Sequence, residues 1–322
     1  MPQVEIKHLE DVSAYKVATL FKQNPFPLYR DTPLADRMKE YMLERARKSG
    51  QGTLVALIDG EPVLTGQIHE VSYLSEYWGI RMGNISHMVT DRPDHEVTRL
   101  AGRELIFHLL ANGHMDFVSV RVPGPSVMLA RALEDAGFRY AEGFVNIVGT
   151  AGNFREQFRV DGVTIREMKE SDLAEISKAY GSMPFPGRFI TDGGFDREKA
   201  VRLYVHRFEE VYEKKLGQIF VAELNGAFAG ALIALVDKDI SNTLGVKTNP
   251  LSGMGIIIHP RATRKGVALN LLEHRQGWYK EQGVEHINFG VNFNNIPMLR
   301  GVAKLGLKRG STDMSLHWRK RL

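Results

Sequence analysis

Apolar residues recur with two different periods along the first half of the chain. Within residues 96–111, Leu100, Leu105, Leu109 and Leu110 lie on or near one helical face, which predicts an amphipathic helix. Residues 53–58 predict a strand that ends at Asp59-Gly60, a favoured hairpin turn, so a return strand is expected over 62–73. The other elements predicted here are helices at 12–21, 34–46 and 127–136, strands at 4–9, 85–89 and 117–122, and a hairpin over 138–148.

The second half repeats this order of elements. A hairpin is expected around Asn225-Gly226, between strands at 218–224 and 227–236. The remaining predictions are helices at 172–180, 197–214 and 267–282, strands at 163–168, 255–259 and 286–291, a helix ending near Leu305, and a final strand pair. Strands interleaved with helices indicate an α/β or α+β class.

Three pairs of landmarks indicate that the halves are a duplication. Nearly the same interval separates the two hairpin turns, the helix-stopping Gly113 and Gly283, and the later glycines Gly137 and Gly306. A near-constant offset is typical of a repeated domain, whereas two unrelated α/β domains have no reason to share one. The polar segment 150–162 is aperiodic, so we predict domains at 1–150 and 160–322.

Composition narrows the functional classes. The chain has 322 residues, no cysteine and a net charge of +4. Zero cysteines exclude disulfides, a thiol nucleophile and thiolate-bound zinc, and no metal site is expected. The basic excess is too small to indicate a nucleic-acid partner. The charged N-terminus is unlike a signal peptide, and no apolar run approaches the roughly 20 residues that span a bilayer, so we expect a cytoplasmic protein with no membrane association.

Residues 255–272 have the pattern of a phosphate cradle. An apolar strand ends at Pro260, a basic turn follows, and a helix restarts after Gly266. Backbone N–H groups at a helix N-terminus bind anions, and the cations of the turn would add charge. The GxxxxGK[ST] loop of nucleotide triphosphatases and the GxGxxG of dinucleotide folds are both absent.

These residues resemble the acyl-CoA site of the GNAT acetyltransferase superfamily. Ile258-His259-Pro260 is similar to its strand-ending V-x-P step, and Thr263–Ala268 to its Q/R-x-x-G-x-G/A loop. Asn295, the helix after it and Gly306-Leu307 occupy the expected places further on. The resemblance implies two tandem GNAT-like domains, each a mixed, mostly antiparallel sheet flanked by helices, with acetyl-CoA as co-substrate. The residues it assigns to CoA are Ile257, Ile258, His259, Arg261, Arg264, Lys265, Gly266, Val267, Ala268 and Asn295.

The first half departs from this pattern. In SHMVTDRPDHEVTRLAG, Pro93 fits, but Arg99 stands where Gly266 would be. Asp91, Asp94 and Glu96 would repel phosphate. We therefore expect a degenerate domain at 1–150 without a CoA loop, which shapes or covers the substrate cleft.

Short stretches also resemble the amino-sugar-nucleotide N-acetyltransferases typified by dTDP-fucosamine acetyltransferase. They are Ser75–Arg81, Leu133–Val145 and Gly187-Arg188-Phe189. The resemblance implies a primary amine on a small molecule, possibly an amino-sugar nucleotide, as acetyl acceptor. Phe185, Arg188 and Phe189 are the candidate substrate contacts, although loop aromatics more often pack locally. An amino acid, a peptide or an antibiotic amine is the alternative acceptor.

The catalytic residues are less well marked. His259 and Asn292 are the candidate bases, each with a structural alternative: a turn-facing histidine and ordinary turn chemistry. Family members carry a tyrosine that protonates the leaving thiolate, and its place here is Val302. Either Tyr279 or a water replaces it, or the CoA thiolate leaves unaided, or the chain is a non-catalytic acyl-CoA-binding protein.

Overall fold

The computed structural model describes residues 3–27, 29–30, 32–49, 52–153, 160–183, 187–249 and 255–320. They form two compact units, one of Met1–Gly143 with Ser311–Leu322 and one of Phe144–Gly310. We call them unit 1 and unit 2 and describe each by itself. As predicted, both are mixed α/β units in which most strand pairs are antiparallel.

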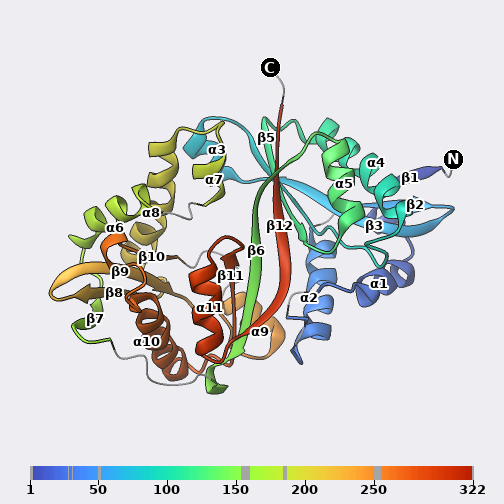
Figure 1. Cartoon of the computed structure of the whole chain (residues 1–322). Coiled ribbons are helices and arrows are strands. Elements are labelled where there is room, and N and C mark those ends of the chain that lie inside the picture. The colour runs from blue at the N-terminus through green and yellow to red at the C-terminus, as the bar shows by residue number, and fades with distance from the viewer. Residues whose placement is uncertain are drawn as a thin grey trace. The chain divides into compact units, whose positions relative to one another are not determined.

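Unit 1 is built on one sheet, in the order β1-β2-β3-β4-β5-β12. Its strands are β1 (Val4–His8), β2 (Thr53–Ile58), β3 (Glu61–Glu70), β4 (Met82–Ser86), β5 (Phe117–Pro123) and the C-terminal part of β12 (Lys308–Arg319). Helices α4 (Glu96–Gly113) and α5 (Val127–Asp135) cover one face through a core that includes Leu105 and Leu129. Helices α1 (Ala14–Gln23) and α2 (Ala35–Lys48) cover part of the other (Figure 1). Among these pairs, only β4 and β5 run parallel.

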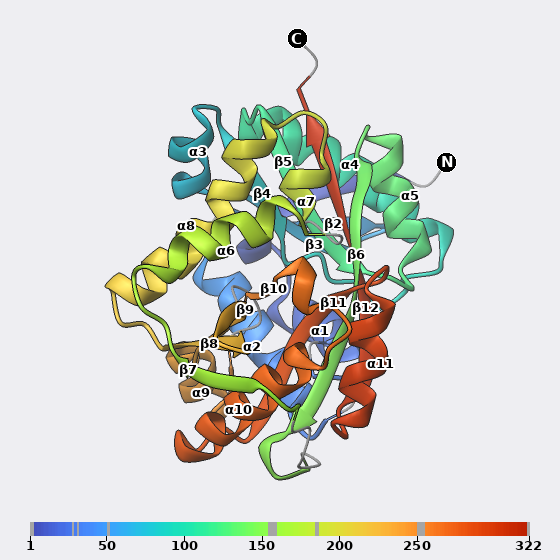
Figure 2. The same cartoon turned by 60° about the vertical axis from the view of Figure 1, so that its left-hand side comes forward.

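Unit 2 contains a sheet in the order β10-β9-β8-β7 and a separate pairing of β11 with β6. The strands are β7 (Val163–Glu167), β8 (Gln218–Leu224), β9 (Ala227–Ala234), β10 (Ile256–Ile258), β11 (His286–Asn292) and β6 (Arg139–Thr150). Helices α10 (Val267–Glu281) and α11 (Ile296–Lys304) contribute to a core with Leu271 and Val302. Helices α6 (Asp172–Gly181) and α8 (Arg197–Glu213) lie on the opposite face of β8 and β9 (Figure 2).

The two units repeat each other element by element. β11 starts as many residues after β5 as α11 starts after α5 and β12 starts after β6. Both predicted hairpin turns are present, with Asp59-Gly60 and Asn225-Gly226 in left-handed conformations. Both hairpins also shift register, after Ala56 and after Ala222, at the same position relative to each turn. The predicted duplication therefore extends to a bulge that no sequence pattern marks.

The last strand of each repeat lies in the other unit. In unit 1, β5 pairs with Asp313–Arg319 of β12, at the end of the chain. In unit 2, β11 pairs with Phe144–Thr150 of β6, the strand that follows α5. The compact units accordingly divide at Gly143, earlier than the polar segment 150–162, and unit 1 includes the chain's final strand. Strand pairing between distant segments depends on register rather than composition, which explains why no local pattern reveals it.

Some local predictions were wrong. The expected hairpin over 138–148 is the single strand β6, since Gly143 keeps an extended conformation and no turn interrupts the run. The expected final strand pair is the single strand β12. The return strand ends at Glu70, and the short helices α3 (Ser72–Trp78), α7 (Arg188–Thr191) and α9 (Lys238–Leu244) went unpredicted because each spans about two turns or less.

Candidate functional site

Among the residues that the structure describes, strand β10 pairs on one side only, with β9. Ile256–Ile258 pair with β9. Before and after them, the Gly255 carbonyl accepts from the Ile233 N–H, and the His259 N–H donates to the Ala229 carbonyl. Alternate residues of a paired strand direct their backbone groups to opposite sides, so those of Ile256 and Ile258 point away from β9. The side chain of Ile257 is fully buried. This edge has the polar groups needed to pair with an extended ligand.

β10 and β11 diverge in unit 2, whereas their counterparts in unit 1 are joined. β4 and β5 pair in parallel over Met82–Ile85. In the described part of unit 2, the corresponding parallel contact is the isolated bridge between Thr248 and His286. Next to it, the buried amide of Asn249 accepts from the Asn288 N–H at 2.7 Å and donates to the Asn288 carbonyl. The strands are therefore held together before β10 begins, and no described residue pairs with the outer edge of β10.

A tight turn brings the chain from β10 into the N-terminus of α10. Arg264 (φ 65°) and Gly266 (φ 76°) are both left-handed, a conformation that costs little only for glycine. Gly266 is the N-cap residue and has no side chain with which to cap the helix. The N–H groups of Val267 and Ala268 belong to the first turn, which has no intrahelical acceptors. The helix start thus offers backbone donors and the positive end of the helix dipole to an anion.

The cations of this loop have different surroundings. The Arg261 guanidinium donates to the Phe228 carbonyl, with Nε at 3.2 Å, and ties the loop to the start of β9. Arg264 and Lys265 are exposed and make no ion pair with a described residue. Two of the three predicted phosphate contacts are therefore available to a ligand, and the third has a structural bond.

The predicted asparagines and His259 all have local partners. Asn295 Oδ1 accepts from the Met298 N–H at 3.2 Å and caps α11, so its Nδ2 group is the part able to donate to a ligand. Asn292 Oδ1 accepts from the Asn294 N–H at 2.9 Å. His259 Nδ1 accepts from the Arg261 N–H at 3.3 Å. These bonds favour the turn-forming interpretation of Asn292 and His259 over a role as base.

Val302, at the place of the family's tyrosine, and Tyr279, its possible replacement, both lie in the core. Val302 is completely buried in α11 and has no polar atom in its side chain. Tyr279 is also completely buried, and burial raises the pKa of its hydroxyl, which meets the backbone of Leu235. Neither side chain reaches a surface from which it would serve a thiolate.

On the α6 side of β10, aromatic residues surround Gly255. A Cβ added to Gly255 would lie 3.1 Å from the Phe208 ring and 3.4 Å from the Tyr180 hydroxyl. Tyr180 stacks on Tyr204 with ring centroids 5.8 Å apart, and burial raises its pKa. Helical spacing alone presents Tyr180 as an ordinary core residue, so the sequence carries no signal for this position.

Two of the predicted substrate residues, Arg188 and Phe189, lie on α7, where the Phe189 N–H donates to the Tyr204 hydroxyl at 3.4 Å. Arg188 covers the ring of Phe189 on α7 at 4.9 Å, and the Phe189 ring packs edge-on against Phe195 at 5.2 Å. Phe189 is buried, which agrees with local packing. Phe185 lies outside the described residues.

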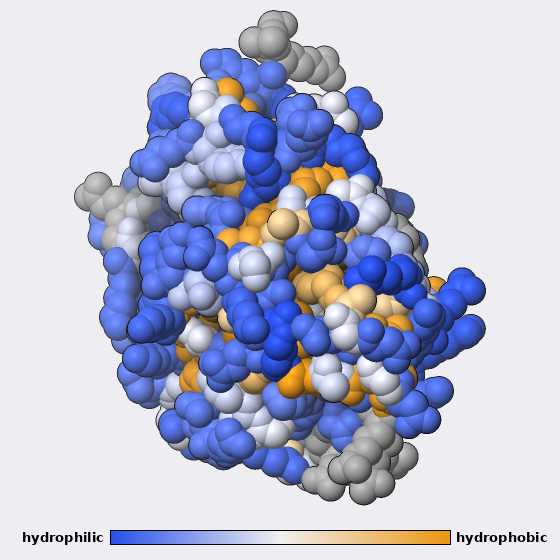
Figure 3. Space-filling model, turned by 90° about the vertical axis from the view of Figure 1, so that its left-hand side faces the viewer, coloured by the Kyte–Doolittle hydropathy of each residue, from blue (hydrophilic) through white to orange (hydrophobic). Residues whose placement is uncertain are grey.

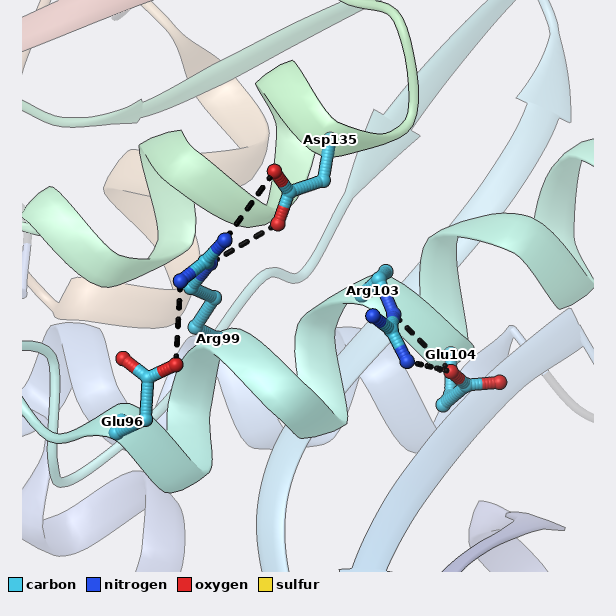
Figure 4. Close-up of polar contacts among 5 residues, drawn as sticks. All are labelled: Glu96, Arg99, Arg103, Glu104 and Asp135. Atoms are coloured by element: carbon cyan, nitrogen blue, oxygen red, sulfur yellow. Dashed lines mark hydrogen bonds and ion pairs between the residues drawn. The ribbon is translucent and has the colours of Figure 1, made fainter.

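In unit 1, the place of the α10 loop is filled. With Pro93 aligned to Pro260, α4 begins earlier than α10 does, and His95 caps its Val97 N–H. Arg99, at the position of Gly266, binds Asp135 on α5 with Nε at 2.9 Å and also binds Glu96 (Figure 4). A Cβ at Gly102 would lie 2.9 Å from that of Ala132, so α4 packs directly on α5.

No described helix is long and apolar enough to cross a membrane, and no described group of three or more His, Asp or Glu side chains is arranged to hold a metal. On the face drawn in Figure 3, hydrophobic residues reach the surface in patches between hydrophilic ones.

Comparison with known proteins is consistent with this geometry. Residues 190–307 match the model of the acetyltransferase (GNAT) family. No curated protein sequence is significantly similar to the chain. A GCN5-related N-acetyltransferase from Sphaerobacter thermophilus shares the fold with a TM-score of 0.60 and 16% identity, over 99% of this chain and 97% of that one.

Two further structures share the fold. A GCN5-related glucosamine N-acetyltransferase region of a fungal multi-domain GH3 β-N-acetylglucosaminidase has a TM-score of 0.56 and 14% identity, over 99% of this chain and 38% of that one. A functionally unknown protein from Staphylococcus epidermidis has a TM-score of 0.51 and 13% identity, over 80% and 91%. The match to the acetyltransferase (GNAT) family model therefore covers β10, the start of α10 and β11, and the solved structures show that the chain shares the fold of GCN5-related N-acetyltransferases.

Proposed function

We propose that unit 2 transfers an acetyl group from acetyl-CoA to a primary amine of a small molecule. The observation that carries this proposal is the uncapped N-terminus of α10 behind the left-handed turn at Gly266. The pyrophosphate would accept from the N–H groups of Val267 and Ala268, with Arg264 and Lys265 adding charge. The Asn295 Nδ2 group, which the α11 cap does not use, would donate to the CoA arm.

The free edge of β10 fits the second half of the cofactor. An extended pantetheine arm has amide groups that pair with a strand edge, and Ile256 and Ile258 direct theirs away from β9. A backbone N–H at this edge would also stabilise the oxyanion that forms when the amine attacks the thioester. Only about one alkylamine in a thousand is neutral at pH 7, so removal of its proton, directly or through water, must accompany attack.

For the acceptor we propose an amino sugar, either free or as part of an amino-sugar nucleotide. Support comes from the stretches at Ser75–Arg81, Leu133–Val145 and Gly187–Phe189. One fold neighbour is also named as a glucosamine N-acetyltransferase region, at an identity that conveys fold alone.

A substrate panel tests the proposal. The full chain would be incubated with acetyl-CoA and amino-sugar nucleotides, amino sugars, amino acids, peptides and aminoglycosides, and release of the free thiol would be recorded. We expect release with the sugar amines. If free thiol is released only with the other amines, the assignment of a sugar acceptor is wrong, but the proposal of acetyl transfer stands. No release with any amine, from a preparation that binds acetyl-CoA in calorimetry, would contradict acetyl transfer itself.

Val302 supports a second candidate, a non-catalytic acyl-CoA-binding protein. Val302, at the place of the family's usual acid, is completely buried and has no polar atom in its side chain. Calorimetric binding of acetyl-CoA without turnover on the panel is the outcome this candidate predicts. Turnover with any amine would contradict it.

A further inference from the structure

Unit 2 contains a buried tyrosine hydroxyl that makes no hydrogen bond with any residue that the structure describes. It belongs to Tyr180 on α6, which is 6% exposed. The two other enclosed tyrosines of unit 2 differ, because the Tyr279 hydroxyl meets the backbone of Leu235 and the Tyr204 hydroxyl accepts from the Phe189 N–H at 3.4 Å. A buried hydroxyl without a partner costs free energy on folding, so native proteins keep few of them. A ligand would supply the partner that the Tyr180 hydroxyl lacks.

Two rings of α8 hold the Tyr180 ring in place. Tyr204 stacks on it with the ring planes 13° apart, and the Phe208 ring meets it edge-on with the centroids 6.1 Å apart. Both are favoured arrangements of aromatic pairs. The position of the Tyr180 hydroxyl is therefore set by packing of the ring, before any ligand binds.

This hydroxyl lies beside the first peptide of β10. It would be 3.4 Å from a Cβ on Gly255, and because glycine has no side chain, the hydroxyl faces bare backbone. The Gly255 carbonyl accepts from the Ile233 N–H. In a trans peptide the N–H points the opposite way, so the Ile256 N–H is directed to the outer edge of β10. A side-chain donor on the face of the sheet and a backbone donor at its edge thus lie next to the same peptide.

We propose that Tyr180 is a catalytic hydrogen-bond donor, whose hydroxyl binds the thioester oxygen of acetyl-CoA together with the Ile256 N–H. The inference rests on the acetyl transfer proposed for unit 2 and assigns a side chain to it. When the amine nitrogen bonds to the thioester carbon, an electron pair moves onto this oxygen, and it returns as the C–S bond breaks and the sulfur leaves as a thiolate. The proton that the nitrogen loses passes through water to the thiolate, and Tyr180 keeps its own proton.

The surroundings of Tyr180 suit a donor rather than an acid. Burial, and then the neighbouring Tyr204, raise the pKa of the Tyr180 hydroxyl, so it stays neutral throughout the pH range of an assay. An ordinary thiol has a pKa of about 8.5, well below that of a buried tyrosine, so a thiolate would not take the proton. A neutral donor that is fixed before the reaction stabilises an oxyanion without reorganisation. Tyr180 therefore does not replace the acid that is missing at Val302.

Acetyl-CoA labelled with ¹³C at the thioester carbonyl tests this contact in the full chain. Isotope-edited infrared difference spectra would give the carbonyl stretching band of the bound thioester. We expect a lower wavenumber than for free acetyl-CoA, because hydrogen bonds to the oxygen weaken the C=O bond, and Tyr180→Phe should lose part of this shift. Tyr279→Phe, which also removes a buried hydroxyl from unit 2, should keep the wild-type band. The same band in Tyr180→Phe and the wild-type chain would overturn the proposal.

Turnover and stability give two further readouts. With an acceptor identified on the substrate panel, Tyr180→Phe should lower kcat about a hundredfold, the usual cost of one oxyanion donor, and leave the Kd for acetyl-CoA within about threefold. Its Tm should not fall, because the lost hydroxyl had no described partner, whereas the Tm of Tyr279→Phe should fall.

The outcomes separate this inference from the proposed function. Wild-type kcat in Tyr180→Phe, in a chain that does transfer acetyl groups, would overturn the catalytic role of Tyr180 alone. If the wild-type chain releases thiol with no amine, the proposed acetyl transfer is wrong, and the infrared bands then decide whether the Tyr180 hydroxyl binds the thioester.

Discussion

Arg99 on α4 donates to Asp135 on α5, with Nε and Oδ2 2.9 Å apart, at the position that Gly266 occupies in unit 2 (Figure 4). The hydrogen bond from Arg99 keeps the pKa of Asp135 below its usual range, so the ion pair persists at neutral pH. A side-chain ion pair in unit 1 thus fills the place that is an open helix start in unit 2.

One acetyl-CoA should therefore bind per chain. The α10 loop offers the backbone donors, whereas the start of α4 is capped by His95 and followed by the Arg99 ion pair. Isothermal titration calorimetry of the full chain measures the stoichiometry. Two equivalent sites would show that unit 1 also binds acetyl-CoA, despite the His95 cap and the Arg99 ion pair at the start of α4.

Gly266→Glu should lower acetyl-CoA affinity about a hundredfold or more. The new side chain would place a negative charge at the pyrophosphate position and force a left-handed backbone at φ 76° on a non-glycine residue. Gly277→Glu is the matched control, because Gly277 is exposed on the same helix with nothing within 4 Å of an added Cβ. Unchanged affinity in Gly266→Glu would show that the cradle lies elsewhere.

Asn249→Ala should destabilise unit 2 by about 2–4 kcal/mol, because its buried amide makes two hydrogen bonds to the Asn288 backbone and each orphaned group costs about 1–3 kcal/mol. Urea unfolding measures the change, with the exposed Asn294→Ala as control. A free energy of unfolding equal to that of the control would indicate that water replaces the amide.

Leu316→Ala and Leu307→Ala should weaken different units, although the two residues lie close together in the chain. Both side chains are buried, Leu316 in the core of unit 1 and Leu307 in that of unit 2, and each loss should cost about 2–4 kcal/mol. Hydrogen exchange resolves the units: protection should fall in β2 and β5 for Leu316→Ala and in β8 and β9 for Leu307→Ala. Loss in unit 2 for both variants would contradict the exchange of last strands.

Unit 1 should lose stability as the pH falls from 6.5 toward 4. Burial, Arg45 and His69 lower the pKa of His87 to about 4 in the folded chain, against 6.5 for an ordinary histidine. The unfolded chain gains a proton in this range before the folded one does, so the free energy of unfolding decreases, by about 2 kcal/mol after allowance for partial exposure. Urea unfolding at pH 7 and pH 4.5 measures the loss, which should be smaller in His87→Asn. An equal loss in that variant would assign the acid sensitivity to other groups.

Local patterns in the sequence predicted most of the fold. Apolar periodicity located most of the longer helices within a few residues, and Asp59-Gly60 and Asn225-Gly226 predicted both hairpin turns. The constant offset between landmarks predicted the repeat. These features depend on residues close together in the chain, where propensity and turn chemistry act directly. The α10 loop belongs to the same class, because its turn and helix start are local.

The tertiary structure decided what depends on distant partners. Neither the pairing of β12 with β5 nor that of β6 with β11 has a local signature, since strand edges accept any segment of compatible register. The surroundings of a side chain are equally non-local: Arg261 is tied to Phe228, and Tyr180 lies beside Gly255. The sequence by itself determined the elements, the repeat and the candidate loop. Only the packing of those elements decided which strands complete each unit and which polar side chains remain available to a ligand.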